Sequence, residues 1–268
     1  MMNGYKEIYN TLRAWFLNYI SRMECPDEAC RFHFDFKRTH SLRVVGEINA
    51  LGRALRLPAR DLLLASTIAV LHDVGRFEQY KNFRTYDDTA SVDHGALSAH
   101  ILGETDVLNG FTSQEQEIIR GAIYWHNKPV LPKDQREEVL FFAQLIRDAD
   151  KLDIYRVVSK YGPFAEHPDG SPPKPLQEDV SEHIFTSLLE GRSVDYSQVR
   201  SETDAALARI FWVYDLNFKP ALRLVAKRNY LEALAVPLPD TPRVTRLLTQ
   251  ARQYLSARVC LIEKNKEA

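Results

Sequence analysis

The chain has 268 residues, of which 45% are hydrophobic and 26% are charged, so it can bury a substantial core. Its 35 basic and 36 acidic side chains leave a formal net charge of -1, and we expect neither a nucleic-acid polymer nor a membrane as partner. Residues 1–8 lack the apolar segment of a secretory signal, and the longest apolar run, 62–71, is about half the length of a membrane span. These features predict a cytoplasmic protein.

Three cysteines, Cys25, Cys30 and Cys260, leave one thiol unpaired whatever the connectivity, which suits a reducing compartment. Cys25 and Cys30 flank Pro26 in an expected loop, where thiolates can act as weak metal ligands. We expect all three to be reduced side chains with no part in the chemistry.

The first third of the chain has the hydrophobic pattern of helices, except for one short segment. Residues 5–23 carry apolar side chains at a spacing of 3.6 residues, which predicts an amphipathic helix. In residues 31–36 polar and aromatic side chains alternate, as they do in a short strand, and we interpret this segment as an extended connector. The helical pattern resumes over 37–57 and places His40 on the apolar face of the first turn.

The next segment predicts two helices separated by a loop. Pro58 opens a helix that ends at Gly75. Residues 78–89 are polar and aromatic without a clear period, which favours a loop. Ser91 then fits the N-cap of a helix reaching about residue 102, with His94 in its first turn.

Two stronger helix signals follow. Thr112 to Glu115 has the spacing of a capping box and starts a helix whose last turn holds His126. Residues 137–161 form a long apolar-rich helix with Asp150 at its middle. No segment shows a strand pattern as strong as these helical patterns, so we predict an all-α fold.

The last third predicts a proline-rich surface loop over 162–175 and then further helices. The helical segments cover 177–190, 202–218, 220–234 and 241–264, the last with Thr241 as N-cap and Pro242 at the first helical position. No repeat or low-complexity tract marks a boundary, so we expect one domain over residues 1–268.

A set of imidazoles and carboxylates is the main functional signal. His72 is followed directly by Asp73 at the end of the apolar run, and histidine nitrogen and carboxylate oxygen suit zinc, iron or manganese. A His-Asp dipeptide alone proves little. Other potential ligands fall at predicted helical positions, however, and together they indicate a buried metal site: His40, His94, His126 and Asp150.

In order and spacing these residues resemble the HD superfamily of metal-dependent phosphohydrolases. The resemblance covers about residues 36–160 and includes the run from Arg147 to Asp153 that holds Asp150. It implies an HD-domain helical bundle, here with additional C-terminal helices at about 177–264. His94 and His126 match the branch with six protein ligands, which includes HD-GYP phosphodiesterases and di-iron oxygenases. The Gly-Tyr-Pro motif is absent, because residues 161–163 read Tyr-Gly-Pro.

The resemblance implies two divalent ions, with Fe, Mn and Zn all compatible. His40, His72 and Asp150 would bind one ion, and His94 and His126 the other. Asp73 would bridge the two, and a water between them would lose its proton readily and attack phosphorus.

Basic residues near these ligands are candidates for substrate binding. Arg76 follows His72 by one turn, and we assign it to phosphate binding and to the catalytic group with His72 and Asp73. Lys128 and Lys151 are lesser candidates.

Neighbouring ionisable residues receive other roles. Asp153 would orient a ligand from behind, whereas Asp148 would form a surface pair. We interpret the remaining histidines, His33, His100, His167 and His183, as structural or exposed.

The sequence thus predicts a hydrolase of a phosphate ester of a nucleotide or other small molecule, with a homo-oligomer left open. One alternative is an HD-type di-iron oxygenase with the same six ligands. Another is a nucleotide-sensing module without turnover.

Overall fold

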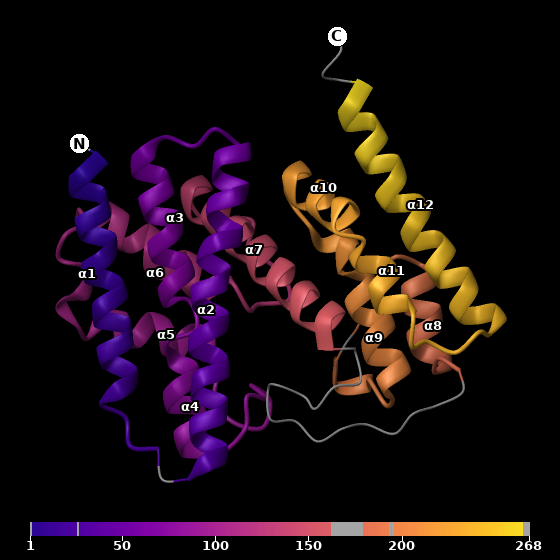
Figure 1. Cartoon of the computed structure of the whole chain (residues 1–268), viewed down its shortest axis with the longest axis horizontal. Coiled ribbons are helices and arrows are strands. Elements are labelled where there is room, and N and C mark those ends of the chain that lie inside the picture. The colour runs from indigo at the N-terminus through magenta and orange to yellow at the C-terminus, as the bar shows by residue number, and fades with distance from the viewer. Residues whose placement is uncertain (1, 26, 162–178, 193, 195, 265–268) are drawn as a thin grey trace. The chain divides into compact units, whose positions relative to one another are not determined.

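The computed structural model describes residues 2–25, 27–161, 179–192, 194 and 196–264 (Figure 1). Every regular element in these residues is helical, which confirms the all-α prediction. The described residues divide into two compact units, one up to Asp153 and the other from Ile154 onward. The single domain expected from the sequence stays a prediction.

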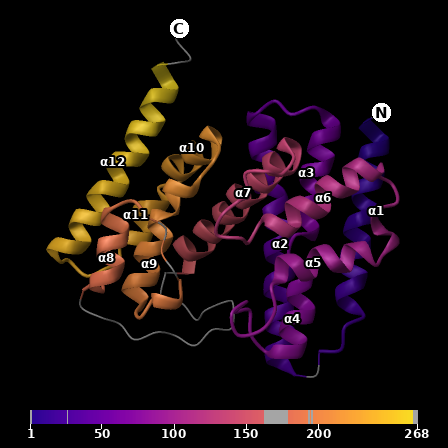
Figure 2. The same ribbon diagram turned by 180° about the vertical axis from the view of Figure 1, so that it is seen from behind.

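The first unit is a helical bundle. Helix α1 (Met2–Ser21) forms where the apolar periodicity predicts it and buries Leu12 and Phe16. Helix α3 (Ala59–Leu71) is almost fully buried and packs against α1, α2 and α6, and these helices lie close together in both views (Figures 1 and 2). Among the described helices, none combines the length and apolar composition needed to cross a membrane.

Helix α2 (Glu28–Ala54) begins earlier than the sequence pattern indicates. The prediction that residues 31–36 form an extended connector is wrong, because this segment lies inside the helix. Asp27 caps it by accepting a hydrogen bond from the Cys30 amide at 2.7 Å. Phe34 faces the core, where its ring meets Phe77 at 5.2 Å between centroids.

The start of α2 also brings two cysteines together. Cys25 and Cys30 form a disulfide with their Cα atoms 5.5 Å apart, so the expectation of reduced thiols is wrong for this pair. Cys30 lies in the first turn of α2, which Asp27 caps. The candidate metal clusters found among the described residues contain no cysteine.

A tight turn separates α3 from α4 (Gly75–Phe83) and holds His72, Asp73 and Val74. The predicted loop over 78–89 is therefore wrong for its first part, which is helical up to Phe83. Arg84 ends α4 in the left-handed region with φ of 57°.

Gly75 allows close contact between α4 and α5 (His94–Gly103). A Cβ atom at Gly75 would lie 2.8 Å from the Ser98 amide nitrogen and 2.9 Å from the His94 carbonyl oxygen. Two backbone atoms of α5 would have to move, so only glycine fits this approach.

We expect Gly75→Ala to push α5 outward and cost about 1–3 kcal/mol of unfolding free energy, the usual range for overpacking. His94 would move with α5. Gly46→Ala is the matched control, because Gly46 is an exposed position of α2 with nothing within 4 Å of an added Cβ. This control should stabilise by about 0.5–1 kcal/mol through helix propensity. Urea denaturation measures both, and equal stabilities of the two variants would contradict the close contact.

The N-caps of the next two helices differ in how well the sequence predicts them. Asp93, not Ser91, caps α5 by accepting from the Ala96 amide at 3.0 Å. The Ser91 hydroxyl instead accepts from the Gln79 side chain. The capping box at Thr112 is confirmed and starts α6 (Ser113–Trp125).

Two elements complete the first unit. A short 3-10 turn, η1 (Asp106–Leu108), precedes α6, and α7 (Glu137–Tyr161) follows it as predicted. The first unit includes α7 up to Asp153.

The second unit is helical, and its helices are shorter and more often interrupted than predicted. The expected helix 202–218 ends at Ile210, and 220–234 is interrupted at Asn229, whose φ is 53°. The Thr241 cap is confirmed, since its hydroxyl accepts from the Val244 amide at 3.2 Å. The loop predicted over 162–175 lies outside the described residues. The elements are α8 (Glu182–Leu189), η2 (Tyr196–Gln198), α9 (Glu202–Ile210), η3 (Phe211–Asp215), α10 (Lys219–Lys227), α11 (Tyr230–Ala235) and α12 (Pro242–Lys264).

Candidate metal centre

The six predicted ligands lie on different elements of the first unit. They come from α2, the α3–α4 turn, the start of α5, the residue after α6, and α7, in the order His40, His72, Asp73, His94, His126 and Asp150. Five of them are buried, and Asp150 is the most exposed, with 24% of its side chain accessible. The fold thus gathers a nitrogen- and oxygen-rich cluster with one more open side.

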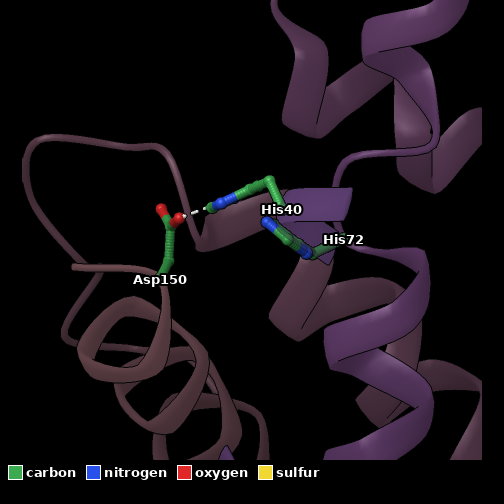
Figure 3. A group of neighbouring side chains, drawn as sticks. All are labelled: His40, His72 and Asp150. Carbon is green, nitrogen blue, oxygen red and sulfur yellow. Dashed lines mark ion pairs between the residues drawn. The ribbon is translucent and has the colours of Figure 1, made fainter. Parts of the chain in front are cut away.

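Two groups within this cluster have the geometry of a metal site, and they share His72. One consists of His72, Asp73 and His126, and the other is drawn in Figure 3. His40 Nε2 lies 3.0 Å from Asp150 Oδ1, and His72 adds a third ligand atom within 4.8 Å of the others. Ligand atoms bound at about 2.0–2.2 Å to one ion lie about 3–3.5 Å apart, so small adjustments would let these three bind a common cation.

The Asp73 carboxylate faces two pairs of histidines with its two oxygens. Its Oδ2 lies 3.7 Å from the Nε2 atoms of both His40 and His72. Its Oδ1 lies 3.5 Å from His94 Nε2 and 3.7 Å from His126 Nε2. The His94 and His126 Nε2 atoms are themselves 3.0 Å apart. A carboxylate in this position is able to bridge two cations.

Backbone carbonyls orient two of the rings. His72 Nδ1 donates to the Ala69 carbonyl at 2.8 Å, and His126 Nδ1 donates to the Ile123 carbonyl at 2.6 Å. Burial lowers the pKa of His72, so its Nε2 is the unprotonated nitrogen of a neutral ring, the form that binds metals. His72 Nε2 is buried without a hydrogen-bond partner among the described residues. A buried acceptor in this state is costly unless a ligand completes it, so the donor set fits a metal ion.

Asp153 supports His40 from behind, as the sequence predicts. Its Oδ2 accepts from His40 Nδ1 at 2.8 Å. Arg43 binds the same carboxylate through Nε and Nη2 at 2.7 and 2.8 Å. Asp153 is fully buried, and this network fixes the His40 ring.

Asp88 orients the His94 ring in the same way, and it was not identified from the sequence. One oxygen accepts from His94 Nδ1 at 2.6 Å and from Asn127 Nδ2 at 2.9 Å. The other accepts from Arg76 Nη1 at 3.0 Å and Gln79 Nε2 at 2.9 Å. The segment around Asp88 has no periodic pattern, so nothing in the sequence singles it out.

Two cations lie against Asp73. The Arg76 Nε atom is 3.7 Å from Asp73 Oδ1, and the Lys37 ammonium is 3.1 Å from Oδ2. Their side chains are 14% and 12% exposed, and both approach the Tyr86 ring, at 5.6 and 5.2 Å from its centre. Lys37 was missed, although its place one turn before His40 on α2 was an available signal.

The two lesser candidates for substrate binding, Lys128 and Lys151, have different surroundings. The Lys128 ammonium pairs with Asp93, which caps α5, and lies 4.5 Å from the centre of the Tyr124 ring. Lys151 is half-buried beside Asp150 on α7, and its role stays a prediction.

Two further expectations concern residues outside the ligand set. The expectation that Asp148 forms a surface pair is wrong, because Asp148 is fully buried inside the bundle. The other histidines fit structural or exposed roles: His33 packs on the Tyr80 ring, His183 bonds to the Gln198 carbonyl and His100 is exposed. His167 lies outside the described residues.

Burial and the carboxylates set the protonation states. Burial lowers the pKa of His72 to about 4 and, with the nearby Arg76 charge, that of His94 to about 3. Burial also disfavours the charged form of His40, but its hydrogen bonds to Asp150 and Asp153 outweigh this and raise its pKa to about 9. At neutral pH His72 and His94 are therefore neutral, whereas His40 is protonated in the metal-free protein.

We expect metal binding to release one proton from His40 at pH 7, because a ligand imidazole must be neutral. Affinity should then rise by up to about tenfold per pH unit below pH 9 and level off above it. Calorimetric titration with Mn²⁺ in buffers of different ionisation enthalpy measures the proton count. A count of zero at pH 7 would contradict this assignment.

Comparison with known families agrees with this geometry. Residues 38–155, a little under half of the chain, match the family model described as HD domain. All six predicted ligands lie within the matched residues. No curated protein and no solved structure matches the chain.

Proposed function

We propose that the chain, which carries an HD domain over residues 38–155, is a metal-dependent phosphohydrolase that hydrolyses a phosphate ester of a nucleotide or another small molecule. The observation that carries the proposal is the position of Asp73, whose two oxygens face separate pairs of histidines. This arrangement supports two ions rather than one.

The proposed ligand sets follow these pairs. His40, His72 and Asp150 would hold one ion, in agreement with the cluster in Figure 3. His94 and His126 would hold the second, and Asp73 would contact both. The donors are imidazoles and carboxylates without thiolate, a set that suits Fe, Mn or Zn.

Bound divalent ions would supply an acidified water and neutralise charge on the phosphoryl oxygens. The protein's own groups would position the substrate. Arg76 Nη1 is held by Asp88 and by the Tyr86 carbonyl, while Arg76 Nε is buried without a hydrogen-bond partner among the described residues. Asp73 Oδ1, at 3.7 Å, is too far to accept a hydrogen bond from that N–H, so we assign the N–H to a phosphate oxygen; Lys37 adds a second positive charge beside Asp73.

The direct test is metal analysis of anaerobically purified protein, followed by a screen of phosphomonoesters and phosphodiesters. We expect about two ions per chain and release of phosphate or a phosphomonoester from at least one substrate. Oxygen uptake in an electrode, without any phosphate release, would contradict hydrolysis. Tight nucleotide binding without product from metal-replete protein would contradict it as well.

A further inference from the structure

A cavity in the first unit lies between α1 and α4, and it is separate from the candidate metal ligands. Its volume is about 360 Å³, at the lower end of the range of about 300–1,000 Å³ for small-molecule sites. None of the six candidate ligands lines it. Helix α4 thus contributes Arg76 to the metal centre and other side chains to this cavity.

The aromatic wall of the cavity is held in place. Trp15 and Tyr19 stack with centroids 5.1 Å apart and an interplanar angle of 18°. The Tyr19 hydroxyl donates to Glu78 Oε1 at 2.5 Å, which ties α1 to α4. The same two helices also contact through Phe16 of α1, which packs edge-on against Phe77 of α4 at 5.8 Å between centroids. The wall therefore exists before any ligand binds.

The rim carries polar groups that this part of the chain leaves unused. Arg22 and Lys81 line the cavity, are exposed, and form no ion pair with the described residues. The side-chain amides of Asn18 and Asn82 also line it and make no hydrogen bond within the described part of the chain. Glu78 is the acidic group in the lining, and it accepts from Tyr19. Two cations and one carboxylate thus line the cavity, and their net charge is positive.

We propose that this cavity binds a small planar aromatic anion of the size of a nucleoside monophosphate. The ring system would contact Trp15 and Tyr19, since aromatic faces favour flat partners. The Asn18 and Asn82 amides offer donors and acceptors to the edge of a base. Arg22 and Lys81 would bind the phosphate. This site goes beyond the proposed hydrolysis, because it uses none of the residues assigned to that reaction.

The test is calorimetric binding of the phosphonate analogue of adenosine monophosphate, which a phosphohydrolase does not cleave, to the metal-loaded full-length protein. We expect Arg22→Ala and Lys81→Ala each to raise Kd by about tenfold or more, the loss of one charge-assisted contact. Arg13→Ala is the matched control, because Arg13 is exposed on the same helix and does not line the cavity. Its Kd should stay within about twofold.

Further arms separate this cavity from the metal centre. Arg76→Ala should leave the binding event that depends on Arg22 and Lys81 unchanged, and adenosine or ribose 5-phosphate alone should bind this cavity at least about tenfold more weakly than the analogue. Binding that depends on Arg76 and not on Arg22 would place the ligand in the metal centre and overturn the proposal. Equal affinity for inorganic phosphate, or no binding of the analogue, would also overturn it.

Discussion

Replacing Asp73 by alanine is expected to remove the bound metal and to lower phosphoester hydrolysis by about 10³-fold or more. Asp73 faces both histidine pairs, so its loss weakens both proposed ion sites at once. Metal ions contribute several kcal/mol to such reactions, and each 1.36 kcal/mol is a factor of ten. Metal content by mass spectrometry and initial rates with the best substrate of the screen measure the two effects.

Two companion variants make this result specific. Asp73→Asn keeps the shape of the side chain but removes its charge, and it should lose metal as well. Asp35→Ala is the control, because Asp35 lies on α2 with a 70% exposed side chain and pairs only at the surface with Arg38. It should keep metal and activity. Full metal content and activity in Asp73→Asn would disprove the bridging role.

His72→Ala separates the two proposed ions. Only one of the two sets includes this residue, so we expect it to lose more of one ion than of the other. Circular dichroism shows whether each variant is folded. A folded His72→Ala protein with two ions per chain would contradict the assignment of His72.

The residues that the fold gathers in the candidate metal centre could be named from the sequence, because the signal that singles them out is local. A His-Asp pair at the end of an apolar run, with further histidines on apolar helix faces, is visible in the sequence alone. Asp88 and Lys37 were not found, because their roles depend on tertiary contacts with His94 and with Asp73. An aspartate in an aperiodic loop looks the same whether it faces water or an imidazole.

Some helix boundaries were predicted wrongly for a related reason. Alternating phenylalanines at 32, 34 and 36 suggest a strand, but the Asp27 cap starts α2 before them, and Phe34 packs on Phe77. Helix α4 lacks a clear apolar period, yet it forms because Gly75 lets it pack closely on α5. Tertiary packing decides both cases, and a single-sequence pattern does not contain it.

Asp153→Ala tests the support behind the first ion. Asp153 is fully buried between His40 and Arg43, and its removal leaves both without their carboxylate. Breaking a buried pair costs about 3–5 kcal/mol, and because Arg43 is 24% exposed we expect about 2–4 kcal/mol. Urea denaturation in the presence of a chelator measures it. A change below about 0.5 kcal/mol, typical of a surface site, would contradict the network.

The pH dependence of this loss has a definite sign. The fold lowers the pKa of Asp153, since hydrogen bonds from His40 and Arg43 outweigh the effect of burial. Its contribution is therefore present above the unfolded pKa of about 3.9 and disappears as pH falls through the folded value. The stability difference between wild type and Asp153→Ala should be full at pH 7 and should shrink in acid.

The same variant acts on metal binding through two opposed effects. Loss of the hydrogen bond to His40 Nδ1 frees the ring and should weaken binding by about 10–100-fold. Loss of the negative charge also lowers the raised pKa of His40, so less free energy is needed to deprotonate it at pH 7. Above pH 9 His40 is neutral in both proteins, and only the orienting effect remains. We therefore expect the variant's deficit in Mn²⁺ affinity to grow between pH 7 and 9, with fewer protons released at pH 7. A deficit independent of pH would mean that Asp153 only orients His40 and does not control its charge.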